Sequence, residues 1–109
     1  MDSKLASLIL SKGIDFPGSS GKIDFHHAVV TKAMARGLPN EFRPLIDSPY
    51  NFITIDHEAH INGTPPSGIK AVPIVCRKWG YEAVRTWYGN IPFKVRPFVF
   101  PTRDEVENG

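Results

Sequence analysis

The chain has a single cysteine, Cys76, among its 109 residues. One thiol cannot form an intrachain disulfide, so a disulfide-stabilised secreted scaffold is excluded, as is a zinc site built on paired cysteines. This usage is typical of a reducing compartment. Because Cys76 lies in an apolar run, we expect it to be a small buried hydrophobic residue and not a nucleophile.

Long hydrophobic runs are also missing. The most apolar stretch, "LASLILSKGIDF", is too short and too interrupted to span a membrane, and it has no cleavage-site pattern. We therefore expect a cytoplasmic protein with no membrane partner. The formal net charge is only +2, which permits a nucleic-acid partner without arguing for one.

Ten prolines and nine glycines predict short elements joined by many loops, and the length fits one small domain. The fold class expected is α+β. Alternating and β-branched residues predict strands over 22–27 and 51–55. Helix-capping residues, glycines and prolines predict four helices: Thr31–Arg36, the segment from the Asp56 cap to Gly63, Ile69–Trp79 and Tyr81–Tyr88. Pro73 is expected in the first turn of the third.

The same signals suggest three parts. Residues 1–21 are expected to be a flexible N-terminal lead-in, because they dissolve into "GIDFPGSSG". Residues 22–100 form the predicted domain, and residues 101–109 are expected to be a loose C-terminal tail.

The stretch "DFHH" places His26 and His27 side by side at the end of the first strand. Successive side chains of a strand diverge, so one imidazole can bind a metal ion while its neighbour faces a water molecule, in either order. Phosphodiester hydrolysis needs such a base and such a ligand close together. His60, on the helix after the second strand, can supply a second ligand.

These residues resemble a known family. "DFHH" followed by "NFITIDHEAH", in which His60 comes nine residues after Asn51, is similar to the HNH, or His-Me finger, endonucleases and to their small phage-type members. The match covers residues 22–63. It implies a ββα-metal core with additional C-terminal helices. It also implies that His26 and His60 are metal ligands, that His27 is the general base, and that Asn51 braces the loop beneath the base.

The resemblance implies metal-dependent cleavage or nicking of DNA. It also implies a phage or prophage protein that acts in the host cell with a packaging or replication partner. Two protein ligands suit one divalent ion, Mg²⁺ or Mn²⁺ first, while imidazole also admits Zn²⁺, Ni²⁺ or Co²⁺. The colicin-type DNases of this family have a further ligand where this chain has Thr64.

Each site residue also has an ordinary reading. The two adjacent histidines can be a strand-end pair with one ring packed and one solvated, Asn51 a turn residue, and His57 a helix-surface residue. Asp24 is expected to point away from an ion, or else to hydrogen-bond one of the histidines. The basic residues Lys32, Arg36 and Arg43 can contact DNA phosphates or form a solvated loop.

The rival interpretation of the whole chain is a non-catalytic nucleic-acid-binding or interaction module with a structural metal site. Metal-dependent cleavage of plasmid DNA distinguishes the two.

Overall fold

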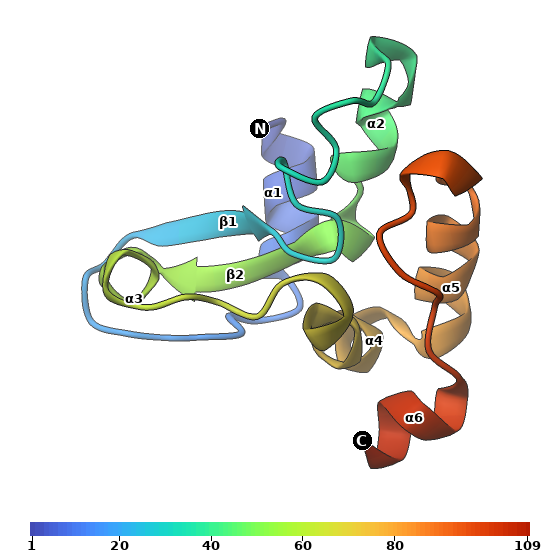
Figure 1. The fold of residues 1–109 in the computed structure, drawn as a ribbon. Coiled ribbons are helices and arrows are strands. Elements are labelled where there is room, and N and C mark those ends of the chain that lie inside the picture. The colour runs from blue at the N-terminus through green and yellow to red at the C-terminus, as the bar shows by residue number, and fades with distance from the viewer.

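The computed structural model describes all 109 residues and confirms the α+β class. Two antiparallel strands form a small sheet, and helices pack around it (Figure 1). The strands are β1 (Ile23–His27) and β2 (Phe52–Asp56). The α-helices are α1 (Ser3–Leu10), α2 (Arg43–Ile46), α3 (His57–Asn62), α4 (Val72–Trp79), α5 (Tyr81–Gly89) and α6 (Arg103–Asn108), and four short 3-10 turns join them.

Strand β2 lies at the centre of the fold, and all five of its residues are buried. On one edge it pairs with β1 in a register that sets His27 opposite Phe52 and Asp24 opposite Ile55. On the other edge, Phe16 donates its backbone N–H to Thr54 and accepts from the N–H of Asp56. Because both of its faces are buried, β2 reads as a continuous apolar and β-branched run rather than a clean alternation.

The N-terminal residues contact β2 through more than this bridge. Ile9 on α1 is fully buried. The Asp15 carboxylate accepts from the backbone N–H of Thr54 at 2.9 Å and forms a largely buried ion pair of 2.8 Å with Lys78 of α4. These contacts attach the expected lead-in, residues 1–21, to the rest of the fold. Leu5, Leu8 and Ile9 have the spacing of an amphipathic turn, whereas the contacts of Asp15 and Phe16 follow from no periodic pattern in the sequence.

The connection between the strands differs from its prediction. The expected helix Thr31–Arg36 is wrong, since this stretch forms only turns. The buried side chains of Ala35 and Leu38 hold this backbone against the core instead. The connection contains α2, which begins beside Pro44.

The helices after β2 follow their local signals. The Asp56 carboxylate caps α3 by accepting from the N–H of Ala59, as predicted. Pro73 lies in the first turn of α4, and Gly80, with φ of +93°, separates α4 from α5. The tail that was expected to be loose contains α6, which starts with a reciprocal capping box between Thr102 and Glu105.

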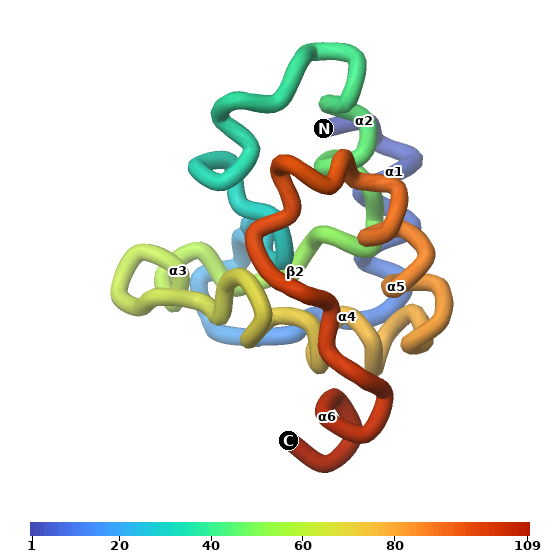
Figure 2. The backbone as a smooth tube through the Cα atoms, turned by 45° about the vertical axis from the view of Figure 1, so that its right-hand side comes forward, coloured from blue at the N-terminus to red at the C-terminus, as the bar shows by residue number.

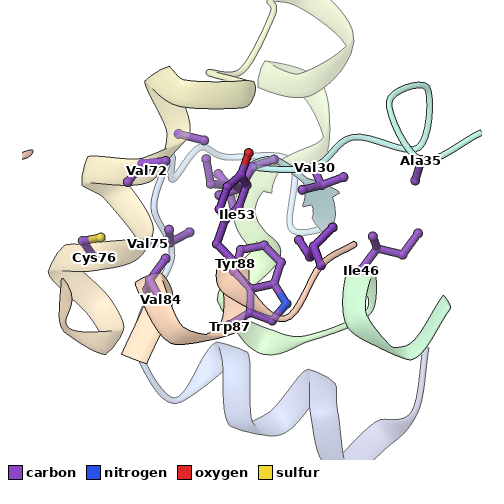
Figure 3. Close-up of a cluster of buried hydrophobic side chains, with 14 of the residues drawn as sticks. Val30, Ala35, Ile46, Ile53, Val72, Val75, Cys76, Val84, Trp87 and Tyr88 are labelled. Carbon is purple, nitrogen blue, oxygen red and sulfur yellow. The ribbon is translucent and has the colours of Figure 1, made fainter. Parts of the chain in front are cut away.

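The hydrophobic core lies between β2 and the pair α4 and α5 (Figure 3). Ile53 points into this cluster, where Val75, Val84 and Trp87 also lie. Cys76 is part of the cluster, as predicted for a small hydrophobic residue, and burial raises the pKa of its thiol to about 11. A thiol with such a pKa stays protonated and unreactive at neutral pH.

The chain after α5 turns back alongside that helix before it reaches α6 (Figure 2). Phe98 stacks on Tyr88 with 4.9 Å between ring centroids, and its backbone oxygen accepts from the Tyr88 hydroxyl. No helix combines the length and the apolar character needed to cross a membrane.

Gly18 tests how firmly the N-terminal segment is attached. A Cβ at this position would lie 2.5 Å from the carboxyl carbon of Asp56, the cap of α3. We predict that Gly18→Ala lowers the free energy of unfolding by about 1–3 kcal/mol, because the cap must shift or the segment must detach. Urea denaturation measures the change.

Gly37→Ala is the matched control, since its Cβ would meet nothing within 4 Å. Its free energy of unfolding should stay within about 0.5 kcal/mol of the wild-type value or rise slightly. Equal stabilities for the two variants would contradict the described contact between Gly18 and Asp56.

Candidate active site

Three of the four histidines line one cleft. His26 and His27 reach it from the end of β1 and His60 from α3, and the cleft has a volume of about 380 Å³. The rings of His26 and His60 meet edge to face, with 5.6 Å between their centroids and 61° between their planes. Phe25, Thr31, Lys32 and Ala33 complete the lining.

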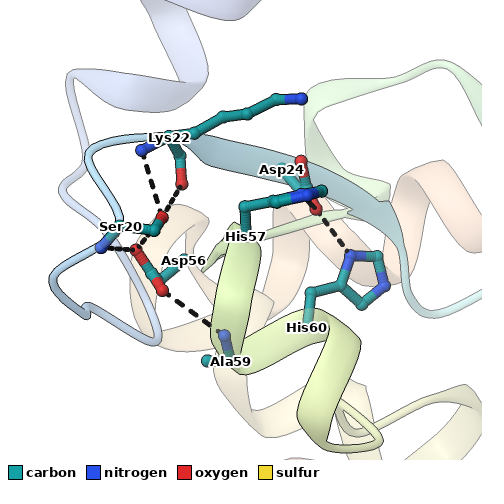
Figure 4. Close-up of polar contacts among 7 residues, drawn as sticks. All are labelled: Ser20, Lys22, Asp24, Asp56, His57, Ala59 and His60. Atoms are coloured by element: carbon teal, nitrogen blue, oxygen red, sulfur yellow. Dashed lines mark hydrogen bonds and ion pairs between the residues drawn. The ribbon is translucent and has the colours of Figure 1, made fainter.

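The orientation of His60 is set by Asp24. The carboxylate oxygen Oδ2 of Asp24 accepts from Nδ1 of His60 at 3.0 Å and from Nδ1 of His57 at 2.8 Å (Figure 4). These hydrogen bonds, the one from His60 first, lower the pKa of Asp24, so it stays ionised. An ionised carboxylate only accepts, so each ring carries a hydrogen on Nδ1, and in neutral His60 the lone pair is on Nε2.

This geometry decides between the two expectations for Asp24, because its carboxylate hydrogen-bonds two histidines. His57, for which the ordinary reading is a helix-surface residue, hydrogen-bonds the same carboxylate and does not line the cleft. Figure 4 shows both rings leaving the same helix, α3, toward the strand that carries Asp24.

His26 is held from a different side. Its Nε2 lies 3.0 Å from the hydroxyl of Ser67, in the turn before α4. Burial, together with the nearby His60 and His27, lowers the pKa of His26 and favours the neutral imidazole, the form that has a lone pair to donate. No pattern in the sequence marks Ser67, because "TPPSG" reads only as a turn.

The pair His26 and His60 fits a shared divalent ion by two criteria. Each ring keeps one nitrogen without a hydrogen-bond partner in the protein, Nδ1 of His26 and Nε2 of His60. Two imidazoles bound to one ion at about 2.1 Å have ring centroids roughly 5.3 Å apart at the tetrahedral angle that Zn²⁺ prefers and roughly 4.6 Å apart at the right angle that Mg²⁺ prefers. The observed 5.6 Å is closer to the tetrahedral value. No group of three or more His, Cys, Asp or Glu residues has a geometry that could hold an ion.

His27 points to another element. Its Nε2 lies 2.9 Å from Oδ1 of Asp47, the residue that ends α2, and its ring packs on Phe52 with 4.5 Å between centroids. The side chain is 15% exposed, so it is largely enclosed yet open to the cleft. Sequence reasoning missed Asp47, because nothing in "PLIDSPYN" marks it as a partner of a residue twenty positions earlier.

Asn51 is fully buried, and its side-chain amide bridges backbone groups of the connection. Its Oδ1 accepts from the N–H of Val30 at 2.8 Å. Its Nδ2 donates to the carbonyls of Val30 and Ile46, both at 2.9 Å. The amide thus joins the start of the connection to its end, which a simple turn residue would not do.

The three basic residues of the connection are all exposed, and none forms an ion pair. Lys32 lines the cleft, where its ammonium group can approach a bound phosphate. Arg36 and Arg43 do not line it, so the structure brings only one of the three to the histidines.

No family model, no curated protein and no solved structure matches the chain.

We predict that Asn51→Ala lowers the free energy of unfolding by about 3 kcal/mol, because it leaves one buried N–H and two buried carbonyls without their partner. Urea denaturation measures the loss. The exposed Asn40, whose side chain makes no hydrogen bond, provides the control Asn40→Ala, which should change stability by less than about 0.5 kcal/mol. Similar effects of the two variants would show that the amide does not brace the connection.

Proposed function

We propose that the protein is a metal-dependent endonuclease that hydrolyses DNA phosphodiester bonds, built on a ββα-metal core formed by β1, β2 and α3. The observation that carries the proposal is the meeting of the His26 and His60 rings beside His27 in a single cleft. The spacing of these residues in the HNH-like sequence pattern supports the same assignment.

In this proposal His26 and His60 hold one divalent ion, Mg²⁺ or Mn²⁺ in the first instance. Such an ion, when bound, offsets the negative charge of the phosphate and of the leaving 3′ oxygen. The Asp24 carboxylate keeps His60 in the required tautomer, because it accepts from Nδ1 and leaves Nε2 to donate its lone pair. Burial keeps His26 neutral for the same purpose.

His27 is the proposed general base. It neighbours His26 in the chain, but its Nε2 bonds a different element, so it can accept a proton while His26 serves as a ligand. Asn51 holds the connection that carries Lys32 beside the cleft. Lys32, with Arg36 and Arg43 farther along the connection, supplies positive charge for phosphate contacts.

Plasmid nicking tests the proposal. With Mg²⁺ or Mn²⁺ we expect supercoiled DNA to be converted to nicked or linear forms, and EDTA should abolish the conversion. His27→Ala should reduce the rate by about 10²- to 10⁴-fold, because the water then lacks its base.

Further measurements show whether the lower cleavage rate of His27→Ala comes from loss of the base. Circular dichroism and metal titration should show that His27→Ala still folds and still binds the ion, whereas His60→Ala should lose metal binding. Lys94→Ala, which removes an exposed positive charge outside the cleft, should cleave like the wild type. Cleavage that persists in His27→Ala or in EDTA would refute the mechanism. Metal binding without any cleavage would favour the non-catalytic module.

A further inference from the structure

The contact between His27 and Asp47 has no counterpart in the sequence pattern that led to the proposed function. We propose that Asp47 is a positioning residue, which fixes the tautomer and the orientation of His27 so that Nδ1 is the nitrogen that takes the proton from water. This inference rests on the proposed nuclease function and adds a residue to it.

The geometry restrains the ring of His27 and the backbone of Asp47, whose side chain is 58% exposed. The His27 ring is packed against Phe52, which is 1% exposed and pairs with His27 across the sheet. The backbone of Asp47 closes α2 by donating its N–H to the carbonyl of Arg43 at 3.2 Å. A carboxylate on a fixed backbone therefore meets a ring on a fixed strand, with 2.9 Å between Oδ1 and Nε2.

The buried amide of Asn51 extends this restraint. It donates to the carbonyl of Ile46, the residue directly before Asp47, and it bonds both backbone groups of Val30, three residues after His27. One side chain thus holds the segment that carries the base and the segment that carries the carboxylate at a constant separation. The Asn51 side chain then positions the base and its carboxylate in addition to stabilising the fold.

The chemistry follows from what a carboxylate can do. Ionised Asp47 only accepts, so the hydrogen of neutral His27 is on Nε2 and the lone pair is on Nδ1, which has no partner in the protein. In the proposed step a water O–H bond breaks and its proton forms a bond to Nδ1. The water oxygen attacks phosphorus, and the P–O3′ bond breaks with its electron pair on the 3′ oxygen. The Asp47 carboxylate faces the resulting imidazolium and stabilises it.

Asp47→Asn tests whether Asp47 sets the tautomer of His27 or only contacts its ring. The amide has the size of the carboxylate but can also donate, so it can bond His27 in the opposite tautomer, with the hydrogen on Nδ1 where it blocks proton uptake. The control is Glu41→Gln, which removes one exposed negative charge, without an ion-pair partner, from the same connection.

Two readouts are taken on the full chain. Nitrogen-15 NMR of the imidazole rings reports the tautomer of His27, and steady-state plasmid cleavage with Mn²⁺ gives kcat and KM. We expect the Nε2–H tautomer in the wild type and in Glu41→Gln, and a shift toward Nδ1–H in Asp47→Asn. The kcat of Asp47→Asn should fall by at least about tenfold with KM unchanged, as for loss of a residue that orients a catalytic group.

The outcomes distinguish this inference from the proposed function. If the wild type cleaves DNA and Asp47→Asn keeps either its tautomer or its kcat, Asp47 is not a positioning residue and the nuclease assignment stands. If the wild type does not cleave, the proposed function fails, and the NMR arm alone decides whether Asp47 sets the tautomer of His27. A higher kcat in Asp47→Asn would show that the carboxylate slows proton uptake by His27, which also overturns the inference.

Discussion

The hydrogen bonds of the Asn51 side chain are the constraint on which the rest of this structure depends. The amide is fully buried and makes three bonds to backbone groups, two to Val30 and one to Ile46. Those residues stand near opposite ends of a connection that has little regular structure of its own. The backbone hydrogen bond from Ala28 to Asn51, at 2.8 Å, joins the same two segments, and Thr31, Lys32 and Ala33 in the first of them line the cleft.

The strand geometry explains why two histidines stand side by side. Alternate residues of β1 face opposite sides, so Asp24 and His26 share the side on which α3 lies, where Asp24 contacts His57 and His60 and the ring of His26 meets that of His60. His27 leaves β1 on the other side, where it meets Asp47 and Phe52, and at the end of the strand it also lines the cleft. Adjacent positions thus give two imidazoles of identical chemistry two different environments. In the proposed function the first binds the ion and the second accepts a proton.

Local signals predicted the parts of the fold that depend on local interactions. Strand β2, the Asp56 cap, Pro73 at the start of α4 and the break at Gly80 were all predicted, since each follows from a few neighbouring residues. The helix expected over Thr31–Arg36 was wrong because burial, not propensity, decides the path there. The contacts of Asp47 and Ser67 were missed because each spans a loop, and pairing across loops leaves no periodic trace in one sequence. The metal ligands, the base and their roles remain proposals based on a pattern, and the geometry is consistent with them.

The most direct test of the account is a crystal structure of the protein soaked in Zn²⁺, with an anomalous difference map collected at the zinc edge. The account predicts one strong peak in the cleft, bonded at about 2.1 Å to one nitrogen of His26 and one nitrogen of His60, with His27 outside the coordination sphere. A peak bound to only one of these two rings, or no peak in the cleft at saturating zinc, would contradict it.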